Sequence, residues 1–69
     1  MNYYLLENHR VKLIDVDGKE YIGDVLLVQG PDETPENEIC IDIEVKGKYG
    51  SYTGYSIYES EIQSVEVLD

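Results

Sequence analysis

The residues best suited to chemistry in this sequence are a lone cysteine and a lone histidine. Cys40 has Glu38 and Asp42 two positions away on either side. Neighbouring carboxylates raise the pKa of a thiol, which is the wrong direction for a nucleophile. We therefore expect Cys40 to be a passive thiol, at the surface or half-buried. His9 is expected to be a surface residue, with a pH-sensitive contact as the alternative.

Two glycine-containing segments could be taken for ligand loops. A calcium loop begins much like residues 15–18, Asp-Val-Asp-Gly, but the third oxygen ligand and the closing bidentate glutamate are missing. Residues 47–50 lack the Lys-Ser/Thr ending and the following helix of a phosphate loop. One cysteine and one histidine provide neither a disulfide nor zinc spacing. We predict no catalytic residue, no metal and no cofactor, and hence no enzyme.

Charge is the strongest compositional signal. The 69 residues, expected to form one domain over 1–69, hold 15 acidic and 5 basic side chains, a formal net charge of −10. Such a surface repels phosphate backbones and anionic membranes and attracts basic partners. No apolar run approaches the roughly 20 residues that span a bilayer, and no signal-peptide pattern opens the sequence. With a single free thiol, these features predict a cytoplasmic location.

The aromatic residues are all tyrosines. Seven tyrosines occur with no phenylalanine and no tryptophan, in a chain that is 42% hydrophobic. Disordered acidic segments contain few aromatic residues, so we expect a folded domain. Tyrosine suits both a half-buried sheet surface and a binding surface, and both roles remain open here.

Alternation of apolar and polar residues predicts five strands, which are expected at residues 9–16, 19–28, 38–46, 49–58 and 62–68. Asp17-Gly18 predicts a tight hairpin. A phase slip in the first strand predicts a bulge or bend, and Gly23 predicts another bend. Residues 25–28 are apolar on both faces, so this strand is either the most buried or meets a partner on one face.

The other segments are shorter. Residues 2–8 are expected to be a short helix or a loose arm, residues 29–37 a loop, and residues 59–61 a turn of 3₁₀ helix. Five short strands with these turns predict an all-β fold, a small, strongly bent antiparallel barrel. In the fourth strand, period two places Tyr52 and Tyr58 on one face and Tyr55 on the other.

Two stretches of the sequence resemble the Sm-like (LSm) family. Residues 11–13 and 17–25 resemble its first motif, and residues 54–67 resemble its second, with Ile57, Ile62 and Val65 at apolar positions. Small SH3-like barrels share the strand order and the bend glycines. The resemblance covers about two thirds of the chain and implies a barrel with the family's ring assembly through strand edges.

The RNA-binding positions of that family are not matched. The region where Sm-like proteins carry an Asp and an Asn is here the acidic loop 29–37, in which Asn37 is the one candidate. Tyr58-Glu59 stands where the second motif has Arg-Gly. The resemblance therefore implies the fold and does not imply RNA binding.

These observations predict a non-enzymatic protein-interaction module with a basic partner, which could also be a homo-oligomer. Its candidate partner-binding residues are Tyr52, Tyr55, Tyr58, Asp42, Glu44 and Glu59. One alternative is a nucleic-acid mimic that presents Asp32, Glu33, Glu36, Glu38, Asp42, Glu44, Glu59, Glu61 and Glu66 to a nucleic-acid-binding protein. The other alternative is single-stranded RNA binding around Lys46, Lys48 and Tyr49.

Overall fold

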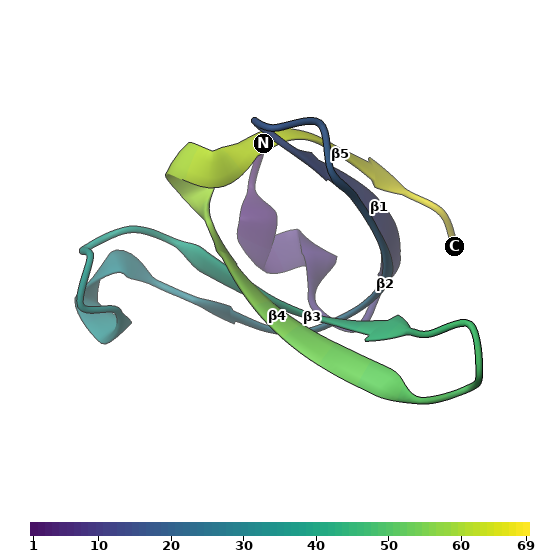
Figure 1. Cartoon of the computed structure of the whole chain (residues 1–69). Coiled ribbons are helices and arrows are strands. Elements are labelled where there is room, and N and C mark those ends of the chain that lie inside the picture. The colour runs from purple at the N-terminus through teal and green to yellow at the C-terminus, as the bar shows by residue number, and fades with distance from the viewer.

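The computed structural model describes all 69 residues and is all-β (Figure 1). The five strands are β1 (Arg10–Asp15), β2 (Glu20–Gln29), β3 (Cys40–Lys46), β4 (Tyr52–Tyr58) and β5 (Ile62–Val67). The three short 3₁₀ helices are η1 (Tyr3–Leu6), η2 (Pro31–Glu33) and η3 (Glu59–Glu61). None of them has the length and apolar character needed to cross a membrane.

The strands form one antiparallel sheet in the order β4-β3-β2-β1-β5. The five strands and the all-β class agree with the prediction. The sheet curls strongly, and η3 carries the chain from β4 at one edge to β5 at the other (Figure 1). No ladder of backbone hydrogen bonds joins β4 to β5, so both strands have a free edge.

Two of the expected irregularities lie where the sequence indicated them. A Cβ atom at Gly23 would overlap the backbone carbonyl of Glu44, so β2 can bend tightly against β3 only without a side chain here. The register of β1 against β5 shifts between Ile14 and Asp15, which is the slip expected in the first strand. A third irregularity, between Val25 and Leu27, is a bulge that the sequence did not predict.

The core lies inside the curl of the sheet. Side chains from β1, β2, β3 and β4 supply it, and η1, which lies within the curl (Figure 1), adds one more. Its members are Leu6, Val11, Leu13, Val25, Val28, Ile41, Ile43 and Ile57. The N-terminal segment is thus a short helix, the first of the two options, and its role is to cover the core with Leu6.

Burial decides between two expectations and corrects a third. Residues 25–28 were expected to be either the most buried strand or a strand that meets a partner on one face, and the first option is wrong, because Leu26 and Leu27 are 55% and 44% exposed. The bulge turns both leucines outward and leaves Val25 and Val28 in the core. Cys40, expected at the surface or half-buried, is only 2% exposed, although its side chain belongs to the outer side of β3.

Candidate protein-docking face

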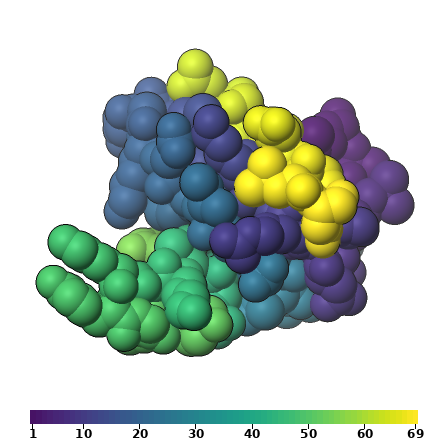
Figure 2. Space-filling view, turned by 90° about the vertical axis from the view of Figure 1, so that its right-hand side faces the viewer, coloured from purple at the N-terminus to yellow at the C-terminus, as the bar shows by residue number.

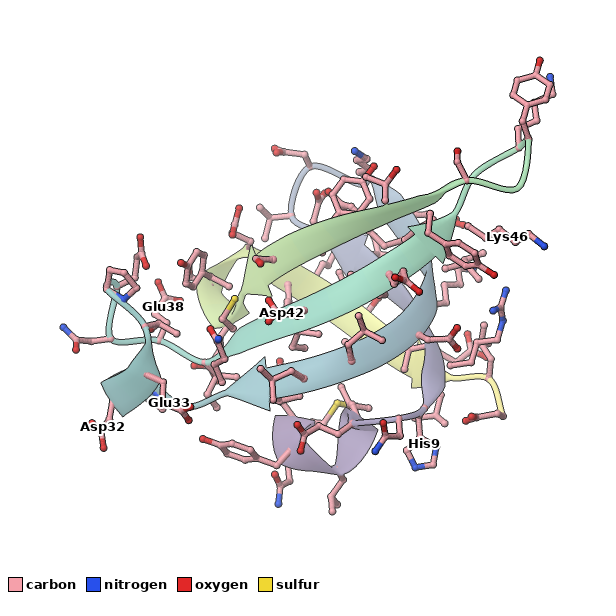
Figure 3. All side chains as sticks on the ribbon, turned by 90° about the horizontal axis from the view of Figure 1, so that it is seen from below. His9, Asp32, Glu33, Glu38, Asp42 and Lys46 are labelled. Carbon is pink, nitrogen blue, oxygen red and sulfur yellow. The ribbon has the colours of Figure 1, made fainter.

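Most of the candidate residues lie on the outer side of β3 and β4, away from the core; Asp42 on β3 is labelled in Figure 3. The strand register sets Asp42 beside Leu27 on β2 and beside Ser56 on β4. We call this surface the docking face and define it by Asp24, Leu26, Leu27, Asp42, Glu44, Tyr52, Ser56 and Tyr58. Four of the six predicted partner-binding residues lie on this face: Asp42, Glu44, Tyr52 and Tyr58.

Asp42 is held at the centre of the docking face. The Ser56 hydroxyl donates a hydrogen bond of 2.7 Å to Asp42 Oδ1, and Cys40 Sγ lies 3.8 Å from the same oxygen. Burial and the negative charge of Asp42 raise the pKa of the Cys40 thiol above its ordinary value. Cys40 therefore stays protonated near neutral pH, as its carboxylate neighbours predicted, while Asp42 presents a fixed negative charge.

Glu44 belongs to an unusual pair of like charges. It lies directly opposite Asp24 across the β2–β3 ladder, and like charges in that relationship repel each other. Arg10 Nη1 lies 4.0 Å from Asp24 Oδ1, with both side chains about half exposed, so this ion pair is weak. On the other side Glu44 faces Gly54, above which there is open space. The sequence pattern did not indicate Asp24, because only the pairing of β2 with β3 places it beside Glu44.

The tyrosines of β4 divide between two faces. Tyr52 is 58% exposed and lies opposite Lys46 on the outer side. Tyr55 points to the inner side, where its ring meets Tyr21 edge to face at 5.0 Å and the Lys19 ammonium lies 5.0 Å from its centroid. Tyr55 therefore lies on the opposite face of β4 from Tyr52 and Tyr58, as the alternation of side chains along a strand requires.

Tyr58 and Glu59 lie at the end of β4, where the docking face meets η3. Hydrogen bonding to the Glu36 carboxylate, then burial and the charge of Glu36, raise the pKa of Tyr58 to about 12. The Tyr58 backbone N–H donates to Glu61 Oε1 at 3.1 Å. Glu59 donates its own N–H to the Ile39 carbonyl at 2.9 Å and keeps its side chain exposed. Glu59 is thus a carboxylate at the border of the docking face.

Many carboxylates of this acidic chain accept hydrogen bonds from the chain itself. Glu38, for example, accepts both the backbone N–H and the hydroxyl of Ser60. The carboxylates that accept such bonds are Glu7, Asp15, Glu33, Glu36, Glu38, Asp42, Glu61 and Asp69. Five of these eight were among the acidic residues proposed for nucleic-acid mimicry, so part of that set already bonds to the chain itself.

The β3–β4 hairpin projects from the body of the molecule (Figure 2). Tyr49 is 89% exposed at its end, and Lys48 Nζ lies 5.7 Å from the centroid of its ring. Gly50 adopts a φ of +87° in this turn, a conformation that glycine adopts without strain. The residues of the predicted basic patch, Lys46, Lys48 and Tyr49, therefore occur together, on a protruding turn rather than in a groove.

The surface contains no pocket and no group of three or more His, Cys, Asp or Glu side chains that could hold a metal ion. Comparison of the chain with protein-family models, curated proteins and solved structures found no match.

Proposed function

We propose that this chain is a non-enzymatic protein-interaction domain of the Sm-like or SH3-like barrel type, and that its docking face binds a protein partner with a basic surface. The observation that carries the proposal is the exposure of Leu26 and Leu27 side by side with the carboxylates of Asp42 and Glu44 on the neighbouring strand. Exposed apolar side chains bordered by charge are typical of protein interaction sites.

The two kinds of side chain on the docking face have different roles in this proposal. Burying Leu26 and Leu27 under a partner gains roughly 25 cal/mol for each Å² of apolar surface removed from water. The carboxylates select lysine and arginine on the partner and accelerate the encounter, since complementary charge acts on specificity and association rate more than on affinity. Tyr52 and Tyr58 add rigid aromatic surface at the β4 side.

Self-assembly is a second part of the proposal. The outward edges of β4 and β5 have unpaired backbone groups, and unpaired edges are templates for pairing with another strand. Pairing β4 of one copy with β5 of the next would produce the ring assembly that the Sm-like resemblance implies.

We also propose a cytoplasmic location, for which the unpaired thiol of Cys40 is the supporting feature.

A capture experiment tests the proposed partner class. The chain is immobilised and exposed to nuclease-treated lysate, in parallel with a Leu26→Ser/Leu27→Ser variant and a Val16→Ser control. Val16 is 60% exposed in the β1–β2 turn, away from the docking face. The proposal requires a protein with a basic surface that is captured by the wild type and the control, is lost with the double variant, and binds less well as salt is added. Equal capture by the double variant contradicts the proposal.

A further inference from the structure

The charges of the chain are segregated along its length. Residues 46–58 contain two lysines and no aspartate or glutamate, whereas the rest of the chain contains all 15 acidic residues and the other three basic ones. The cationic segment comprises the end of β3, the β3–β4 turn and β4. The molecule is therefore a negative body with one positive, tyrosine-rich extension.

The end of the β3–β4 hairpin, which we call the tip, comprises residues 46–51. The turn is ordered by two backbone hydrogen bonds, from Gly47 N–H to the Ser51 carbonyl and from Gly50 N–H to the Gly47 carbonyl. The molecule measures 36 Å along its long axis against 22 and 21 Å across it, and the hairpin protrudes beside the body in Figure 2. Tyr49 is thereby exposed on a defined structure, next to Lys46 and Lys48.

The tip and the docking face are complementary in chemistry. The docking face offers the repelling pair Asp24 and Glu44, which a lysine from outside would relieve, and it offers Leu26 and Leu27 as apolar surface for the Tyr49 ring. The tip continues strands β3 and β4 beyond the docking face, so it extends away from its own face. A tip can therefore meet this surface only on another molecule.

We propose that the tip of one copy docks on the docking face of a second copy. The proposal rests on the proposed function of the docking face and names one partner for it. A single strand of nucleic acid could also contact Lys48 and Tyr49, but it would leave Leu26 and Leu27 uncovered and would approach the negative body. A contact between two different surfaces leaves one tip and one face free, so assembly continues as a chain or closes as a ring.

Charge reversal with rescue tests this proposal. The tip variant is Lys46→Glu/Lys48→Glu, and the face variant is Asp24→Lys/Glu44→Lys. We expect the wild type to increase its average mass at least about twofold with concentration, as a dimer requires, in light scattering at about 0.15 M salt, where the screening length is about 8 Å. Each variant alone is expected to stay monomeric, and an equal mixture of the two is expected to assemble again, because the reversed tip matches the reversed face.

Matched controls separate this proposal from its alternatives. The variant Asp17→Lys/Glu66→Lys changes the charge as the face variant does, but at the β1–β2 turn and on β5, and it should assemble like the wild type. Circular dichroism verifies that each variant folds. A wild type that stays monomeric, a tip variant that still assembles, or a mixture that stays monomeric overturns the proposal. Binding of a labelled oligonucleotide that the tip variant loses, without self-assembly, also overturns it.

The same variants separate failure of this inference from failure of the proposed function. If the docking face binds a different basic protein, the face variant loses that protein while the tip variant keeps it. Self-assembly through the edges of β4 and β5 would persist in both variants, since backbone pairing does not involve these side chains.

Discussion

Gly23 on β2 lies against the backbone carbonyl of Glu44 on β3, so closely that even a Cβ atom at Gly23 would overlap that oxygen. Backbone atoms cannot rotate away as a flexible side chain can. The contact is the point at which β2 bends, with β1 paired along its first half and β3 along its second. It therefore sets the curvature on which both the core and the docking face depend.

We expect Gly23→Ala to lower the free energy of unfolding by at least about 2 kcal/mol, because the added methyl group must push two strands apart. Gly54→Ala is the matched control: it lies in a strand of the same sheet, but no atom lies within 4 Å of the position that its new methyl group would take, so its effect should stay within about 0.5 kcal/mol. Urea denaturation followed by circular dichroism measures both. Equal effects of the two substitutions would show that the close approach at Gly23 does not matter.

Leu26 and Leu27 are predicted to contribute little to folding. Replacing both by serine should change the free energy of unfolding by less than about 1 kcal/mol, since surface substitutions have small effects. Truncating the neighbouring core residue Val28 to alanine, or Ile41 on the facing strand, should cost roughly 1–4 kcal/mol because a buried side chain leaves a cavity. Binding of the dye ANS should also decrease in the leucine variant. A large loss of stability in that variant would assign the leucines to the core instead of to a partner.

The strands and bends of the fold could be predicted from neighbouring residues in the sequence. The residues that meet on the docking face could not, because strand pairing brings them together. Strict alternation in β3 predicted the burial of Ile41 and Ile43, and Gly23 predicted a bend, because these signals depend on neighbouring residues alone. The outward rotation of Leu26 and Leu27 depends on a bulge against β3, and a slip of one residue reverses which side chains face the core. The Asp24–Glu44 pair likewise depends on how β2 pairs with β3. The sequence alone therefore predicted neither the exposure of the two leucines nor this pair of like charges.

The buried thiol of Cys40 makes stability depend on pH in the alkaline range. Its pKa is raised from 9.0 by burial and by Asp42, so the folded state favours the neutral thiol more than the unfolded state does. The resulting stability is fully present below pH 9.0 and is lost as pH rises toward the higher pKa of the folded state. We expect urea denaturation to show this loss in the wild type and a smaller one in Cys40→Ala. Rapid alkylation of the native thiol at pH 8 would contradict a protonated, buried Cys40.

The C-terminal Asp69 should respond to acid in the opposite sense. Its carboxylate accepts hydrogen bonds from His9 Nδ1 at 2.9 Å and from the Arg10 backbone N–H at 3.1 Å, and these two bonds lower its pKa below 3.8. A lowered pKa gives stability that is present above pH 3.8 and is lost as pH falls through the pKa of the folded state. The Arg10 amide resonance should therefore titrate with a midpoint below 3.8 in the wild type and should lose that transition in Asp69→Asn. A midpoint at or above 3.8 would mean that the carboxylate does not hold the C-terminus against β1 in solution.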